Sequence, residues 1–417
     1  MTTVSPRKAE RSQRLLLGAN ATDAVGRSLS DITIDLLFVG ALGATAMQMG
    51  MLNALGSLAF VLASIPAGHM VDKYSAFRVL RIGLGAKLFL LGCLAVLSSA
   101  DALSIPMGML LCALLGICNV FSETSQTTAV PQLIEDDPEN RSAGISKLIA
   151  SLSAADQSMT VVVPALAGTG FALWGAPPLL SISAALGLLA LLMALRVHSH
   201  RPSQGPGGTL KPSAEQGGML AGLRYLLRHR LLLAITVAVM FSNLGLAIGS
   251  SVEAIFIINE LGFGEFGYGI FVSIGGIGGL IGAAVAGKLA GKFPPATLLV
   301  YTGSLQAALT GCVLAAAYAP ELWSMVLLGT FSLGWGIIVL LFNIAASSWV
   351  VQIVPEHLLG RVLSARRLFT FGVVPVGGLA GGAVASAWGI AAGLLGWVVA
   401  AALSVISYLA MRGPATR

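Results

Sequence analysis

Residues 50–93 read GMLNALGSLAFVLASIPAGHMVDKYSAFRVLRIGLGAKLFLLGC, and residues 269–312 repeat the pattern 219 positions later without a gap. Each copy runs from an apolar, glycine-rich stretch through a short basic turn into a second apolar stretch. Identical residues stand at Gly50 and Gly269, Gly56 and Gly275, Gly68 and Gly287, Lys73 and Lys292, Leu80 and Leu299, and Gly92-Cys93 and Gly311-Cys312. The chain is therefore predicted to be a duplication of one architecture.

The composition places both halves in a membrane. Of 417 residues, 56% are hydrophobic and only 10% are charged, whereas soluble domains carry about 25% charged residues. A membrane-spanning helix needs about 20 mainly apolar residues. Twelve such stretches are centred near residues 28, 58, 88, 117, 158, 187, 244, 278, 308, 336, 373 and 400. The predicted fold class is an all-α membrane protein with 12 transmembrane helices in two pseudo-symmetric six-helix bundles.

The basic residues predict the orientation in the membrane. Nearly all Lys and Arg side chains fall in the two tails and the even-numbered connections, while the odd-numbered connections contain only acids. By the positive-inside rule both termini are expected to be cytoplasmic, in a multi-pass protein of the inner membrane. This topology accounts for the net charge of +6, so no nucleic acid partner is expected.

The same pattern predicts the domain organisation. We expect a cytoplasmic tail at residues 1–14, an N-terminal bundle at 15–197, a cytoplasmic linker at 198–230, a C-terminal bundle at 231–412 and a tail at 413–417. The linker is rich in Pro, Gly and Ser up to residue 218. Its last part spaces Arg224, Arg228 and Arg230 beside leucines, as in an amphipathic helix at a membrane surface.

One cytoplasmic turn carries a resemblance to a known family. The turn at residues 68–78, GHMVDKYSAFR, resembles the G-x-x-x-D-[RK]-x-G-x-x-[RK] loop signature of the major facilitator superfamily. Ser75 stands where the signature has glycine, and in the second copy Gly291 stands where it has the acid. The resemblance implies a twelve-helix transporter whose cytoplasmic side is held closed in one conformation by a latch. The implied latch residues in this turn are Gly68, Asp72, Lys73 and Arg78.

Two further motifs extend the resemblance. The segment Pro131-Gln132-Leu133-Ile134-Glu135 followed by Arg141 recurs as Val351-Gln352-Ile353-Val354-Pro355 followed by Arg361, and these two arginines complete the implied latch. The segment Val163-Pro164-Ala165-Leu166-Ala167-Gly168 resembles a degenerate copy of the family's GPxxGG antiporter signature in helix five, through Pro164 and Gly168. Together the motifs imply the drug and siderophore exporter branch of the superfamily.

The first spanning helix carries Asp23, Arg27, Asp31 and Asp35, one charge every four residues. This spacing forms one slowly drifting stripe. Each charge in a membrane is costly, so several on one helix indicate function. Counting about 1.5 Å per residue places Asp23, Arg27, Glu123 and Asp156 at one depth, roughly 12 to 18 Å from the cytoplasmic end of their helices.

We expect Arg27 to lie among Asp23, Asp31, Glu123 and Asp156 as a proton-coupling and substrate site, because helices one and four flank the central cavity in the family. The alternative is a structural salt-bridge network that ties helices one, four and five together. Asp35 and Glu253 lie nearer the periplasmic ends and are proton carriers or gate-lining groups. Lys87 is a snorkelling or paired lysine in one interpretation and a substrate ligand in the other.

Other cavity side chains are expected from both halves. The polar candidates are Asn20, Asn119 and Gln126 in the first half and Asn243 and Asn343 in the second. The second half contributes an apolar, aromatic wall for a lipophilic substrate or, alternatively, ordinary core packing. The residues of this wall are Phe241, Phe331, Trp335 and Phe342.

A proton-coupled exporter is the leading prediction for function. It would exchange protons for small amphipathic organic molecules such as drugs, macrolides or siderophores, and would work as a monomer without cofactors. The alternatives are a proton-coupled importer of an organic solute and a non-transporting sensor or scaffold with the same fold. The four cysteines lie in apolar segments without CxxC or His-rich spacing, so neither disulfides nor a metal site are expected. The sequence contains no phosphate loop and no nucleophile-base pair, which argues against an enzyme.

Overall fold

The computed structural model describes residues 6–134, 141–197, 220–289 and 293–411. Their regular structure is helical, and ten of the helices are long and apolar enough to cross a membrane. The contacts divide the chain into two compact units. Unit 1 comprises Met1–Leu42 and Leu58–Pro212, and unit 2 comprises Gly43–Ser57 and Ser213–Arg417.

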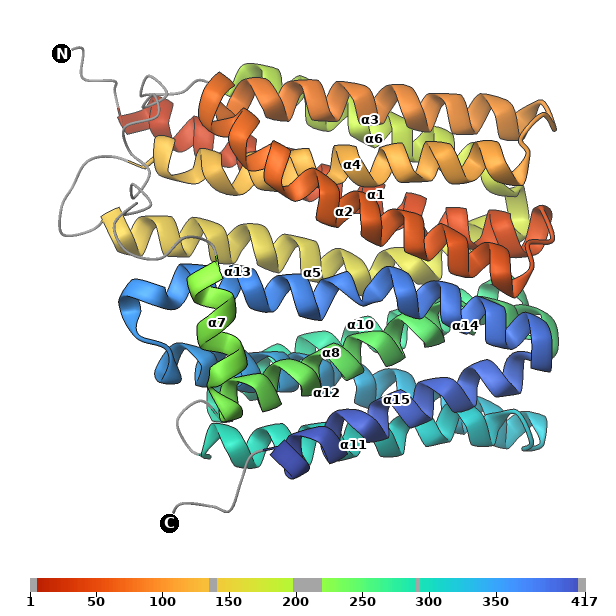
Figure 1. Cartoon of the computed structure of the whole chain (residues 1–417). Helices are drawn as coiled ribbons and strands as arrows, with labels where there is room; N and C mark the ends of the chain where they lie inside the picture. Colours follow the sequence, from red (N-terminus) through yellow and green to blue (C-terminus); the bar gives the residue numbers. More distant parts are fainter. Residues whose placement is uncertain (1–5, 135–140, 198–219, 290–292, 412–417) are drawn as a thin grey trace. The chain divides into compact units, whose positions relative to one another are not determined.

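Unit 1 is built from six long helices (Figure 1). They are α1 Pro6–Leu36, α2 Ala46–Tyr74, α3 Ala76–Ser99, α4 Ile105–Ala129, α5 Arg141–Trp174 and α6 Ala176–Arg196. The first part of α2 belongs to unit 2 by its contacts. In unit 1, α1 packs on α5 and α6, and α3 packs on α4 and α6. The core at one end of this unit is formed by Leu16, Leu80, Val130, Ala194 and their neighbours.

Unit 2 repeats this plan. Its helices are α7 Leu220–Arg228, α8 Arg230–Ser250, α9 Glu253–Ile255, α10 Gly264–Leu289, α11 Pro295–Ala316, α12 Glu321–Ile353, α13 Glu356–Gly372, α14 Val374–Trp388 and α15 Ile390–Met411. Here α8 packs on α14 and α15, and α11 packs on α12 and α15. These pairings match those of α1 and α3 in unit 1, so the duplication in the sequence is a duplication in the fold.

The duplication extends to irregular turns. The π-helical turns η1 Leu37–Ala41 and η3 Phe256–Glu260 stand 219 positions apart, the offset of the sequence repeat. Gly43 and Gly262, which follow these turns, share the same offset and both have positive φ, 62° and 70°. A positive φ is strained for residues with a Cβ atom. Glycine is therefore required at this corner in both units.

The predicted spans match the described helices. The predicted centres fall inside described helices, except that the eleventh, at Val373, marks a break between α13 and α14. Two predicted spans, α1 and α5, do not meet a simple criterion of length and hydropathy. The four charges of α1 interrupt its apolar stretch, and the described apolar part of α5 is the shorter Val163–Trp174. The fold class predicted from the sequence is confirmed.

The turn between α2 and α3 explains the glycine in the loop signature. Ser75 adopts φ 89° and ψ 132°, a region that glycine occupies readily and other residues rarely. The backbone at this position requires a positive φ, which the glycine of the family signature adopts freely. Serine adopts it with strain.

Helix α7 differs from the spanning helices in its direction. Figure 1 shows it set crosswise to α8 at one end of unit 2. Leu226 is fully buried in the core of this unit, while Arg224, Leu227 and Arg228 are exposed. His229 ends the segment and caps α8, because its Nδ1 accepts a hydrogen bond from the Leu232 backbone N at 3.3 Å. The predicted linker residues 198–219 lie outside the described residues.

Candidate functional site

Arg27 is shared by two carboxylates from different helices of unit 1. Its Nη1 donates to Glu123 Oε1 on α4, and its Nη2 donates to Asp156 Oδ1 on α5 at 3.2 Å. The side chains are 16% exposed for Arg27, 46% for Glu123 and 41% for Asp156. The cluster is thus open on the acid side, where a proton or another cation can reach it.

Asn20 adds a neutral donor to the same cluster. It lies about two turns before Arg27 on α1, and its Nδ2 donates to Asp156 Oδ1 at 3.4 Å and to the Leu152 carbonyl at 3.2 Å. One carboxylate oxygen of Asp156 therefore accepts from both Arg27 and Asn20. These bonds fix the position of the acid on α5.

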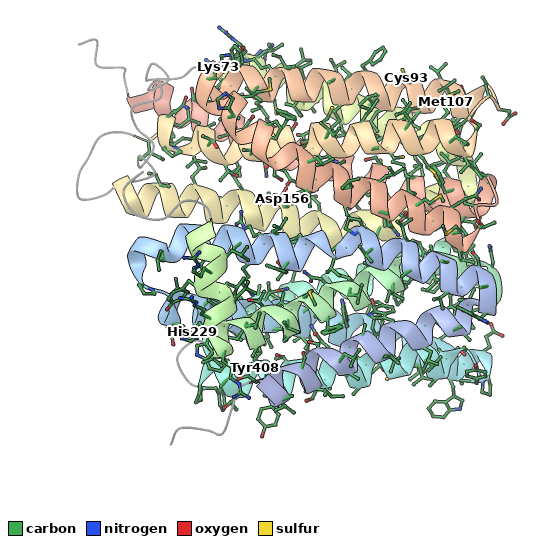
Figure 2. The ribbon with its side chains drawn as sticks, in the orientation of Figure 1. Lys73, Cys93, Met107, Asp156, His229 and Tyr408 are labelled. Atoms are coloured by element: carbon green, nitrogen blue, oxygen red, sulfur yellow. The ribbon has the colours of Figure 1, made fainter. Side chains whose placement is uncertain are left out.

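Figure 2 places this cluster along the unit. Asp156 lies about midway along α5, between Lys73 at one end of unit 1 and Met107 at the other. The expected depth in the membrane stays a prediction. The sequence correctly brought Arg27, Glu123 and Asp156 together.

Asp23 has a different partner from the one expected. Its Oδ1 accepts a hydrogen bond from Lys87 Nζ on α3 at 2.7 Å, instead of joining Arg27. Lys87 and Asp23 are 1% and 2% exposed, so the pair is closed to solvent. Of the two interpretations left open for Lys87, the paired lysine agrees with this geometry. A buried and fully matched pair has the features of a structural tie between α1 and α3.

The remaining charged candidates are Asp31, Asp35 and Glu253. Asp31, one turn after Arg27, is exposed and forms no hydrogen bond or ion pair with the described residues. Asp35 and Glu253 are half-buried, the former near the end of α1 and the latter at the start of α9 in unit 2. Their roles stay predictions.

The polar candidates fall into two groups. Asn119 Oδ1 and Gln126 Nε2 are buried on α4 without a hydrogen-bond partner among the described residues, and both flank Glu123 within about one turn. In unit 2, Asn243 Nδ2 donates to the Thr370 carbonyl at 2.8 Å, while Asn343 is exposed on α12.

The aromatic candidates lie in unit 2, and two are core residues there. Phe331 and Phe342 are each 2% exposed, which agrees with the packing alternative. Phe331 contacts Trp335 and Trp397, with ring centroids 5.4 and 5.1 Å away. A lining role stays a prediction for the half-buried Phe241 and Trp335.

Trp397 is a residue that the sequence interpretation missed. It is 1% exposed, and a Cβ atom added to Gly249 would lie 2.2 Å from its ring. The spacing of Gly245 and Gly249 on α8 was the available signal, because glycines four residues apart let a large side chain or another helix approach closely.

The latch and helix-five candidates are only partly described. Lys73 and Arg78 are exposed at the end of unit 1, and Gly68 lies in α2. The side chains of Asp72, Arg141 and Arg361 lie outside the described residues. Pro164 and Gly168 are buried inside α5.

Two repeated helical units that span a membrane, with charges held inside one of them, define a polytopic transport protein. The model of the Major Facilitator Superfamily matches residues 16–373. The chain therefore belongs to this superfamily. It is a multi-pass membrane protein and a secondary transporter of small molecules, not an enzyme, as predicted.

Solved structures agree with this fold. A variant of the nucleoside transporter NupG is 17% identical, covers 96% of this chain and 98% of its own, and superposes with a TM-score of 0.71. A bacterial homologue of the iron transporter ferroportin, in an inward-facing state, is 16% identical, with coverages of 99% and 100% and a TM-score of 0.71. A bacterial homologue of the human lysosomal transporter Spinster is 13% identical, with coverages of 98% and 98% and a TM-score of 0.71. No curated protein matches the chain. At these identities the likeness is one of fold alone.

Proposed function

We propose that the protein is a proton-coupled exporter of small amphipathic organic molecules, in the drug and siderophore branch of the superfamily. The observation that supports this most is the sharing of Arg27 between Glu123 and Asp156. One cation faces two carboxylates there, and Asp31 adds a third acid one turn away. Protonation of either partner weakens its hold on Arg27 and lowers the negative charge of the layer.

The buried pair does not take this role. Asp23 and Lys87 neutralise each other away from solvent, so a proton reaching Asp23 would have to leave Lys87 uncompensated. The exposed acids around Arg27 carry no such penalty. We therefore assign coupling to Arg27, Glu123, Asp156 and Asp31.

Other features complete the proposal. Pro164 and Gly168 support the antiporter branch, and the basic residues support insertion in the inner membrane with both termini cytoplasmic. The latch of Gly68, Asp72, Lys73, Arg78, Arg141 and Arg361 would hold one end closed during alternating access. The half-buried Phe241 and Trp335 of unit 2 would contact the substrate of a monomeric carrier.

Transport by purified protein in liposomes tests the coupling. Glu123→Gln and Asp156→Asn should abolish rhodamine B movement driven by a pH gradient, because neither amide can take up a proton. Exchange of rhodamine B across the membrane without a gradient should continue. A trapped pH indicator reports the accompanying protons.

The matched control is Glu10→Gln. It removes the same charge from an exposed pair with Arg14 outside the spanning region, and gradient-driven movement should persist. If both membrane variants keep gradient-driven movement, the coupling assignment is wrong. If they aggregate on purification, the cluster is a structural network.

A further inference from the structure

Arg366 lies at the start of a candidate spanning segment of unit 2, beside the basic residues expected in the cytoplasmic connection. It is ten residues into α13, half-buried, and the second residue of the apolar span Ala365–Trp388. Val362 and Thr370, one turn before and after it, are buried at 0% and 3% exposure. Arg366 therefore stands on the packed face of α13.

The neighbouring polar groups on this face form hydrogen bonds that do not include the Nε atom of Arg366. Thr370 Oγ1 donates to the Arg366 carbonyl at 3.1 Å, and Asn243 Nδ2 on α8 donates to the Thr370 carbonyl. The Nε atom of Arg366 is buried without a hydrogen-bond partner among the described residues. No ion pair to Arg366 occurs in this part of the chain either.

Three other cations on the long helices of unit 1 have partners. Arg27 has two carboxylates and Lys87 has one, while Arg81 donates to the carbonyls of Ala194 and Val197 at the end of α6. Arg366 differs from all three. A guanidinium cannot relieve its burial by losing a proton, and the described residues supply no anion to this one.

We propose that Arg366 is the recognition site for a carboxylate group on the transported substrate. A guanidinium offers a planar fork of N–H donors that matches a carboxylate in two parallel hydrogen bonds. An unpaired ionisable residue in a membrane span is a functional site by default. The proposal rests on the proposed function and narrows its substrate class to amphipathic molecules that carry a carboxylate.

Binding of benzoate to the purified protein tests this without a membrane or a proton gradient. Benzamide has the same shape without the charge, so it serves as the neutral probe. Benzoate should bind the unmodified protein more tightly than benzamide does. Arg366→Gln should lower the benzoate affinity about ten- to a hundredfold, because it removes charge-assisted hydrogen bonds.

Two further variants refine the result. Arg367→Gln is the matched control, because it removes the same charge from the adjacent, exposed position, and its benzoate affinity should stay unchanged. Arg366→Lys should bind with intermediate affinity, because a lysine keeps the charge and loses the fork. Without any anion, Arg366→Gln should melt at a higher temperature than the unmodified protein, because it removes an uncompensated buried cation.

Three results would each overturn the proposal: no benzoate binding by the unmodified protein, equal binding by Arg366→Gln, or a lower melting temperature for Arg366→Gln. The last would mean that the protein supplies a partner to this arginine. If only the proposed function is wrong, the experiments give a different result. In that case Arg366-dependent benzoate binding persists while gradient-driven transport in liposomes is absent.

Discussion

Lys87 and Arg27 lie in the same unit and have opposite environments. Lys87 is sealed against Asp23, whereas Arg27 faces two half-exposed acids. Burial decides which pair can take up a proton. In a pair buried from solvent, the two charges must separate before the acid can be protonated. Under the proposed function, Lys87 would serve stability and Arg27 would serve coupling.

We predict that the Lys87–Asp23 pair behaves as a structural unit. Lys87→Met alone should lower the free energy of unfolding by about 3 to 5 kcal/mol, because Asp23 is then left buried and unpaired. Asp23→Leu alone should cost about the same. The double variant should recover most of the loss, as measured by thermal or denaturant unfolding of the purified protein. Additive losses in this double-mutant cycle would show that the two charges do not depend on each other.

A control for this cycle exists at the surface. The Arg14–Glu10 pair is exposed on both sides, and exposed pairs contribute about 0 to 1 kcal/mol. Its removal should leave unfolding nearly unchanged.

The sequence could predict which residues carry charge in the membrane, but not every partner. The four-residue spacing places Asp23 and Arg27 on one face of α1, so their association was the simplest expectation. The partner of Asp23 depends on how α3 packs on the unit, which no local pattern records. Arg366 was counted with the cytoplasmic basic residues for another reason. The end of a helix is hard to locate where a basic turn runs directly into a span.

At the scale of elements, the α2–α3 turn carries a strained residue. We predict that Ser75→Gly raises the stability of the protein by about 1 kcal/mol. Relief of a strained φ is worth about 1 to 3 kcal/mol, and the extra freedom of glycine in the unfolded chain offsets about 0.5 to 1 kcal/mol of that gain. Thermal unfolding of the purified variant measures the difference.

The reverse substitution provides the control. Gly175, between α5 and α6, has φ 73°, so Gly175→Ser should destabilise the protein. A stabilised Gly175→Ser, or a Ser75→Gly that is destabilised, would contradict the strain argument.

Spans and turns differ in how well the sequence predicts them. Long apolar stretches fixed the helices because nothing else can satisfy the backbone in a lipid bilayer. The break at Val373 and the π-helical turns η1 and η3 carry no comparable signal. Of these features, the turns η1 and η3 recur at the offset of the sequence repeat. This recurrence indicates that both units need a π-helical turn at this position.

At the scale of the whole chain, the duplication has kept the architecture and changed the chemistry. The ion pairs of Arg27 and Lys87 belong to unit 1, while unit 2 holds the buried rings of Phe331 and Trp397 and the buried Nε atom of Arg366, which has no partner among the described residues. The two units therefore share a fold and differ in their charged and aromatic side chains. Such a division suits a carrier in which one repeat handles protons and the other handles parts of the substrate.

Under the proposed function, the acids around Arg27 predict the direction of transport. Consider liposomes in which the protein has its cytoplasmic face outward and the lumen is acidified. Luminal protons should reach Glu123 or Asp156 when the carrier opens to the lumen, lower the negative charge that holds the substrate, and release it there. The protons then leave to the bath after the return, so rhodamine B should accumulate in the lumen. Glucose, which has no charge for these acids, should not move, and a protonophore should stop the accumulation. If the acid lumen instead drives preloaded rhodamine B outward, the protein is an importer; if it drives no movement, coupling does not reside in the Arg27 cluster.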